Sequence, residues 1–176
     1  MKTIELRRHA ARAKDIDTLS PEGRVQAEDV GRSLSADYDV VFISPAKRAA
    51  ETVAWLLRGQ GRRLPPHAVI PGLRSEFEDR WRSAVTGAGS SRLDVVRRVD
   101  PRLVTEESAR LGEVVRGLFD HVPDGGRALA VGHSPLIEAA VHGLLGVVID
   151  PLGECEGVAL IMDENGEYRV EELRLP

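Results

Sequence analysis

Strand-like and helix-like patterns alternate along most of the chain. Residues 3–7, 39–43, 67–70 and 127–132 form short runs typical of strands, and the second and fourth are apolar enough to be buried on both faces. Apolar residues at helical spacing predict helices over 21–35, after residue 45, from Thr105 and over 136–145. Strands that alternate with helices predict an α/β fold with a largely parallel sheet.

The remaining segments follow other patterns. Residues 158–162 and 168–173 alternate around Glu164-Asn165-Gly166, which predicts a C-terminal antiparallel hairpin. Residues 73–104 are rich in arginine and have no clear period, so we expect short helices and a loop outside the sheet. The chain, 1–176, is therefore expected to form a single three-layer domain, with helices on both faces of the sheet.

Composition limits the possible functions. The 176 residues are 42% hydrophobic and 30% charged, as in an ordinary globular domain, and the net charge of −4 argues against a nucleic-acid-binding protein. No apolar run approaches the roughly 20 residues that span a bilayer, and the amino terminus enters a charged strand without a signal-peptide pattern. Cys155 is the only cysteine, which fits a reducing compartment. We expect a cytoplasmic protein with no membrane contact.

Three Ser-Pro pairs predict helix starts, because serine caps a helix and proline fits its first position. They are Ser20-Pro21, Ser44-Pro45 and Ser134-Pro135, and the last two directly follow predicted strands. The expected convergence of strand ends in an α/β sheet brings three groups of residues to one crevice. These groups are Arg8-His9, the segment 44–48 and His133-Ser134-Pro135.

Arg48 and His133 are the informative members of these groups. Lys47 and Arg48 stand in a helix's first turn, where a cation opposes the dipole, and a bound phosphate would offset this. The alternatives are that Arg48 points into solvent and that His133 bonds only to backbone. His9 and His133 have no Cys or carboxylate at ligand spacing, so we expect no metal site. Structural or surface roles are expected for the other three histidines, His67, His121 and His142.

Four ordered motifs resemble the histidine phosphatase superfamily, the phosphoglycerate-mutase-like or RHG proteins. They are Leu6-Arg7-Arg8-His9-Ala10, the helix start 19–27, the segment Ser44-Pro45-Ala46-Lys47-Arg48-Ala49-Ala50-Glu51-Thr52, and Val131-Gly132-His133-Ser134-Pro135-Leu136-Ile137. Ala10 replaces the usual glycine, as in the small bacterial phosphohistidine phosphatases. The resemblance covers nearly the whole chain.

This resemblance implies a mechanism and a set of site residues. His9 is expected to attack phosphorus and form a phosphohistidine that water hydrolyses, while Arg8, Arg48 and a protonated His133 bind the phosphate. No metal or cofactor is implied. The family's acid is displaced, because Ser75 stands where a glutamate is usual. We choose Glu76 as the proton donor, with two substitutes, Glu78 and Asp79.

The function implied is hydrolysis of phosphate monoesters or phosphohistidine, with a small phosphorylated molecule or a phosphohistidine protein as substrate. A phosphosugar mutase and a non-catalytic module that binds a phosphorylated ligand stay open as alternatives. No feature of the sequence predicts an oligomeric state. Six arginines either line an approach for an anionic substrate or form a solvated face. They are Arg74, Arg80, Arg82, Arg92, Arg97 and Arg98.

Overall fold

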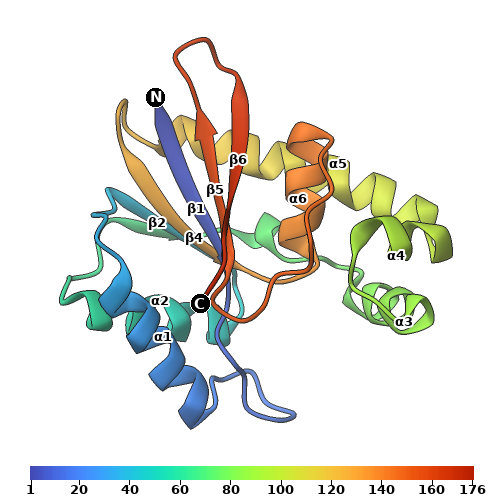
Figure 1. Cartoon of the computed structure of the whole chain (residues 1–176), viewed down its shortest axis with the longest axis horizontal. Helices are drawn as coiled ribbons and strands as arrows, with labels where there is room; N and C mark the ends of the chain where they lie inside the picture. Colours follow the sequence, from blue (N-terminus) through green and yellow to red (C-terminus); the bar gives the residue numbers. More distant parts are fainter.

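A single six-stranded sheet runs through the computed structural model, which describes all 176 residues (Figure 1). The strand order is β3-β2-β4-β1-β5-β6, and the first four of these strands are parallel to one another. β5 is antiparallel to β1, and β6 is antiparallel to β5. The strands are β1 (Lys2–Arg8), β2 (Val40–Ile43), β3 (His67–Val69), β4 (Arg127–Gly132), β5 (Gly157–Met162) and β6 (Tyr168–Leu173). The predicted α/β sheet with a C-terminal hairpin is confirmed.

Helices cover both faces of the sheet, as predicted (Figure 1). Val41 and Leu129 belong to the apolar core shared with α1 (Pro21–Ser33) and α2 (Lys47–Gln60). Ile4 and Leu6 belong to the core on the other face, with α5 (Pro101–Leu118) and α6 (Leu136–Leu145). The alternation follows from the period of two in a strand. No helix of the molecule is both long and apolar enough to cross a membrane.

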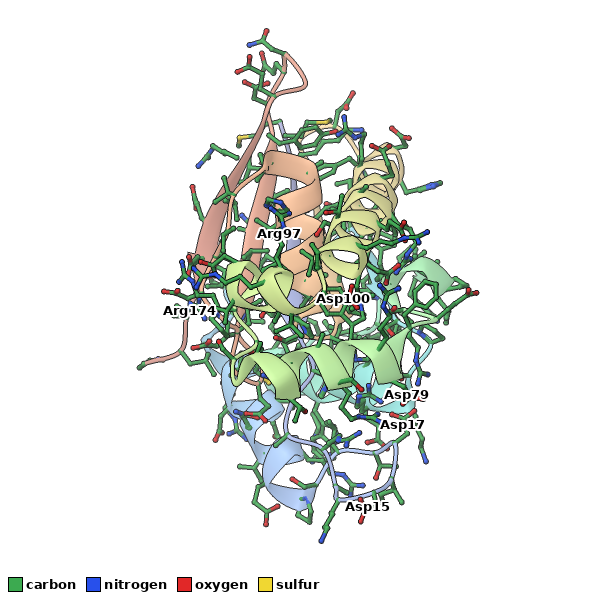
Figure 2. All side chains as sticks on the ribbon, turned by 90° about the vertical axis from the view of Figure 1, so that its right-hand side faces the viewer. Asp15, Asp17, Asp79, Arg97, Asp100 and Arg174 are labelled. Carbon is green, nitrogen blue, oxygen red and sulfur yellow. The ribbon has the colours of Figure 1, made fainter.

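Two helices and two short turns complete the fold outside the sheet. α3 (Glu78–Ala88) packs on α4 (Leu93–Val99), and α4 packs on α5. Residues 73–104 thus form short helices outside the sheet, as expected, and 3-10 turns occupy Pro71–Leu73 and Phe119–His121. Figure 2 views the molecule from this side, with α3 running across the front, above the loop that carries Asp15 and Asp17. This arrangement places α3 beside the ends of the central strands.

The predicted start of α5 at Thr105 is wrong by four residues. The helix begins at Pro101, and the Asp100 side chain accepts a hydrogen bond from the backbone N–H of Leu103 at 3.0 Å. An acidic cap followed by proline at the first position is itself a helix-start signal.

Only the first of the three Ser-Pro pairs caps a helix through its serine. Ser20 Oγ accepts from the backbone N–H of Gly23 at 3.0 Å, as predicted. α2 and α6 have no side-chain cap from their own Ser-Pro pair, because Ser44 bonds to His133 and Ser134 to Glu138. The Ser44 hydroxyl thus serves a histidine that follows β4, and the Ser134 hydroxyl serves a side chain of α6, so neither caps the backbone of its helix.

The strand register brings the predicted residues to one edge of the sheet. Arg8 pairs with Gly132 across β1 and β4, and Ile43 pairs with Val131 across β2 and β4. The residues that follow these three strands are therefore neighbours in space.

Candidate active site

A cleft of about 400 Å³ opens where the carboxyl ends of β1, β2 and β4 meet. Arg8, His9, Arg48 and His133 all line it, so the fold brings together these four predicted site residues. Glu76 does not line it. The charged residues that line the cleft are four arginines and two glutamates: Arg8, Arg12, Arg48, Arg82, Glu78 and Glu154.

His9 is held as a neutral imidazole with a defined tautomer. The side chain is buried, and Nδ1 lies 2.8 Å from the carbonyl oxygen of Ala10. A carbonyl only accepts, so Nδ1 carries the hydrogen and Nε2 carries a free electron pair. Burial, together with the charges of Arg48, Arg8 and Arg12, lowers the pKa of His9 to about 4. Nε2 is therefore unprotonated at neutral pH.

His133 is neutral too, which corrects the expectation of a protonated imidazole. Its Nδ1 accepts from Arg48 Nη2 at 3.0 Å, so Nε2–H donates to Ser44 Oγ at 2.6 Å. Burial and the neighbouring charge of Arg48 lower its pKa to about 3. The His9 and His133 ring centroids are 5.3 Å apart.

Arg48 lies inside the site rather than in solvent. Its side chain is only 11% exposed, and Nη1 donates to Asp17 Oδ1 at 2.6 Å. Asp17 Oδ2 also accepts from the backbone N–H of Lys47 at 2.8 Å. The carboxylate thus occupies the amino terminus of α2, where it offsets the two cations of the first turn.

Sequence reasoning missed Asp17, because the loop that carries it looks merely polar. The signal was the first turn of α2, which has Lys47 and Arg48 and no acid of its own. We expected a bound phosphate to offset those charges, and in the structure the Asp17 carboxylate contacts both residues. Burial raises the pKa of Asp17, but hydrogen bonds from Lys47 and Arg48 lower it more, so the pKa falls below its ordinary value.

Arg8 reaches the cleft with an incomplete set of partners. Nη1 donates to the carbonyl of Leu152 at 2.6 Å, and Nη2 lies 3.9 Å from Glu154 Oε1. Nε of Arg8 is buried without a partner, and the same holds for Nε of Arg48. Buried N–H donors without partners are rare in folded proteins, so two at one cleft point to a ligand that accepts hydrogen bonds.

Of the three candidate acids, Glu78 alone lines the cleft. Glu76 is exposed outside it, and Asp79 is exposed and paired with Arg82. Glu78 accepts from Arg74 Nε at 2.5 Å and from its Nη2 at 3.2 Å, and this pairing lowers the pKa of Glu78. The carboxylate is therefore ionised at neutral pH.

Most of the arginines between residues 74 and 98 do not face the cleft. Arg82 lines it, whereas Arg80 pairs with Asp100 and Arg97 bonds to His142. Burial raises the pKa of Cys155 to about 12, so this thiol is unreactive at neutral pH. Nowhere do three or more His, Cys, Asp or Glu side chains gather in a way that could hold a metal ion.

The comparison with known families agrees with this geometry. The model of the histidine phosphatase superfamily (branch 1) matches residues 4–159, which is most of the chain. The chain belongs to the histidine phosphatase superfamily. Arg8, His9, Arg48 and His133 all lie within the matched residues of this superfamily member. No curated protein sequence matched the chain.

Solved structures of other proteins share the fold at low sequence identity. Phosphoglycerate mutase from Bacillus anthracis aligns with a TM-score of 0.73 and 18% identity, over 97% of this chain and 92% of that one. Phosphoserine phosphatase from Entamoeba histolytica aligns with a TM-score of 0.72 and 17% identity, over 99% and 98% of the two chains. The protein histidine phosphatase SixA, complexed with tungstate, gives 0.65 and 17%, over 97% and 96%. These likenesses establish the histidine phosphatase fold and leave the substrate undecided.

Proposed function

We propose that this protein is a phosphatase that hydrolyses phosphate monoesters or phosphohistidine through a phosphohistidine intermediate on His9. The observation that carries the proposal is the state of His9. Its Nδ1–H is fixed on a backbone carbonyl, its Nε2 is unprotonated, and it lines a cleft with four arginines. A neutral ring nitrogen in such a setting is a competent nucleophile for phosphorus.

The reaction has two displacement steps. Nε2 of His9 attacks phosphorus and forms a P–N bond, while the bond from phosphorus to the leaving group breaks and its electron pair goes to the leaving atom. Water then attacks the phosphohistidine, the P–N bond breaks, and inorganic phosphate is released. The buried Nε–H groups of Arg8 and Arg48 are suited to the equatorial phosphate oxygens, where charge stabilisation is the main requirement.

His133 complements these arginines in the proposal. A phosphate dianion favours the charged form of a neighbouring imidazole and so raises its pKa. His133, which is neutral here beside Arg48, can then take up a proton as the phosphate binds. Arg8, Arg48 and the protonated His133 supply the positive charge that a metal ion gives other phosphatases, so we propose metal-independent chemistry.

Glu78 replaces Glu76 as the proposed proton donor, because it lines the cleft. Its pairing with Arg74 lowers its pKa, which makes it a weak general acid at neutral pH. Substrates whose leaving group needs little protonation are therefore favoured, and phosphohistidine and aryl phosphates are of this kind. The protein histidine phosphatase SixA shares this fold, which is consistent with the phosphohistidine alternative.

The first test is hydrolysis of p-nitrophenyl phosphate by the purified protein in EDTA. We expect activity in the wild type and a loss of more than about 1000-fold in His9→Ala, because the nucleophile is gone. His67→Ala is the matched control, since this exposed histidine on β3 does not line the cleft and its variant should keep full activity. Activity that survives in His9→Ala would refute the mechanism.

The open alternatives give different outcomes. A mutase returns an isomerised phosphate ester rather than free phosphate, which ³¹P NMR of the products distinguishes. A module that only binds phosphorylated ligands shows no turnover of any substrate. The phosphoglycerate mutase of the same fold is the reason to examine the products as well as the rate.

A further inference from the structure

Glu138 is a buried acid that the proposed chemistry does not use. It lies on α6 and is 1% exposed. Its Oε1 accepts from the backbone N–H of Leu152 at 2.9 Å and from Ser134 Oγ at 2.5 Å, while Oε2 is buried without a partner. A buried carboxyl group with an unsatisfied oxygen costs stability, so its presence calls for an explanation.

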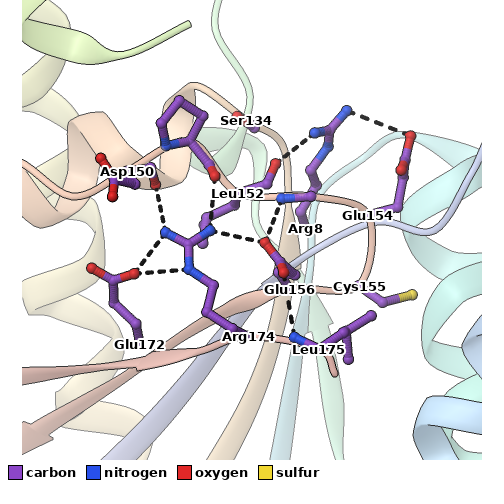
Figure 3. A network of polar contacts seen from close by, with 12 residues as sticks. Arg8, Ser134, Asp150, Leu152, Glu154, Cys155, Glu156, Glu172, Arg174 and Leu175 are labelled. Carbon is purple, nitrogen blue, oxygen red and sulfur yellow. Dashed lines mark hydrogen bonds and ion pairs between the residues drawn. The ribbon is translucent and has the colours of Figure 1, made fainter.

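The peptide groups of Leu152 connect Glu138 to the cleft. The N–H of this residue donates to Glu138, and its carbonyl accepts from Arg8 Nη1 at 2.6 Å. Leu152 is itself buried, which fixes the residue between the two side chains. Figure 3 shows Leu152 beside Arg8, with Ser134 behind them. The position of the Arg8 guanidinium thus depends on where the Leu152 carbonyl lies.

The loop that carries Leu152 is anchored on its other side by Arg174. This arginine donates to the carbonyls of Asp150 at 2.9 Å and Pro151 at 2.7 Å, and it pairs with Glu156 at 2.8 Å (Figure 3). Arg174 therefore holds the residues just before Leu152. Glu138 holds Leu152 itself.

We propose that Glu138 is a positioning residue, which holds the Leu152 peptide so that its carbonyl directs the Arg8 guanidinium into the phosphate site. The inference rests on the proposed function in one respect, which is the assignment of phosphate binding to Arg8. Burial raises the pKa of Glu138, which favours the neutral acid. A glutamine has the same shape and one acceptor oxygen, so Glu138→Gln should preserve the arrangement.

The test compares Glu138→Met with Glu138→Gln. Methionine keeps the length of the side chain and removes the acceptor oxygen, whereas glutamine keeps an acceptor. In crystal structures we expect the Leu152 O to Arg8 Nη1 contact to be lost in Glu138→Met and kept in Glu138→Gln. We expect the affinity of Glu138→Met for orthovanadate to be roughly 10- to 100-fold lower than that of the wild type. The affinity of Glu138→Gln for orthovanadate should equal that of the wild type.

Two controls separate positioning from general loss of stability. Val141→Ala removes buried volume from the same helix and leaves every hydrogen bond of the loop in place, so it should lower the melting temperature and leave vanadate binding unchanged. In an Arg8→Ala background, Glu138→Met should cause no further weakening, because the residue through which it acts is gone.

An intact Arg8 contact in Glu138→Met, or equal weakening in the Arg8→Ala background, would overturn the inference. Glu138→Ala gives the same comparison should the methionine variant not fold. The crystallographic readout does not depend on turnover, so the positioning role and the phosphatase mechanism fail separately. A wild type that binds no vanadate would refute the phosphate site, and the Arg8 contact would still decide the role of Glu138.

Discussion

His9 and His133 lie side by side among arginines, and both have pKa values well below that of free imidazole. Burial and the charge of Arg48 act on both rings, but their hydrogen bonds differ. Nδ1 of His9 donates to a backbone carbonyl, which leaves Nε2 free, whereas both nitrogens of His133 are engaged by Arg48 and Ser44. The geometry therefore assigns the nucleophile to His9 and the supporting role to His133.

The pH dependence of kcat/KM follows from the lowered pKa of His9. Attack requires the neutral ring, which is the major form above a pKa of about 4. After correction for substrate ionisation, we expect kcat/KM to stay level down to about pH 5 and to fall as the pH drops through about 4. An acid limb near 6.5, the ordinary value for histidine, would show that the His9 of the free enzyme is not held neutral in this way.

Glu78 and Glu76 give a matched pair of variants for the proton donor. With an alkyl phosphate, whose leaving oxygen needs a proton, Glu78→Gln should lower kcat by about 100-fold. With p-nitrophenyl phosphate the effect should be small, because the leaving group is stable without protonation. Glu76→Gln should change neither rate, since Glu76 lies outside the cleft. Equal losses on both substrates for Glu78→Gln would contradict an acid role.

The predicted site residues and the residues that sequence analysis missed differ in how their roles arise. Arg8, His9, Arg48 and His133 stand next to strand ends, where the alternation of strands and helices already predicts a site. Asp17 and Glu138 act through contacts made across the fold, to α2 and to the loop at Leu152. Local patterns do not encode such contacts, so neither residue could be assigned from the sequence.

At the scale of elements, the amino terminus of α2 depends on a carboxylate from another segment. Asp17 accepts from the backbone N–H of Lys47 and pairs with Arg48. We expect Asp17→Ala to lower the free energy of unfolding by about 1 kcal/mol, similar to the loss of a helix cap, as measured by urea denaturation. Asp17→Asn should lose less, because its side-chain oxygen still accepts.

The contribution of Asp17 should also depend on pH. Its pKa is lowered in the folded state, so the stabilisation is present above the ordinary pKa and is lost as the pH falls through the lowered value. Lys14→Ala, an exposed change in the same loop, is the control and should leave the unfolding curve unchanged. Asp17→Ala with wild-type stability at neutral pH would contradict the capping role.

The starts of α1 and α2 show what a Ser-Pro pair predicts about a helix and what it does not. Ser20-Pro21 caps α1 as predicted, because nothing nearby competes for the Ser20 hydroxyl. At Ser44-Pro45 the same signal lies two residues too early, because α2 begins at Lys47 with Ala46 as its cap residue. The Ser44 hydroxyl accepts a hydrogen bond from His133 rather than from the helix. A cap signal thus predicts where a helix starts more reliably than it predicts which group satisfies its N–H donors.

For the whole molecule, the order of elements was predictable and their spatial order was not. Alternating strands and helices predicted the largely parallel sheet, and the C-terminal alternation predicted the hairpin. The strand order, which places β4 between β1 and β2, arises from crossover connections that no local pattern records. The same is true of α3, which carries Glu78 and Trp81 to the cleft from the segment without a clear period.

The most direct test of the account is to trap the phosphorylated enzyme. Enzyme mixed with a ³²P-labelled aryl phosphate is quenched within milliseconds in alkaline denaturant, which preserves phosphohistidine, and the labelled peptide is identified by mass spectrometry. We predict a label on His9 that is stable in base and labile in acid, and no label in His9→Ala. Turnover without any labelled intermediate, or a label on another residue, would contradict the account.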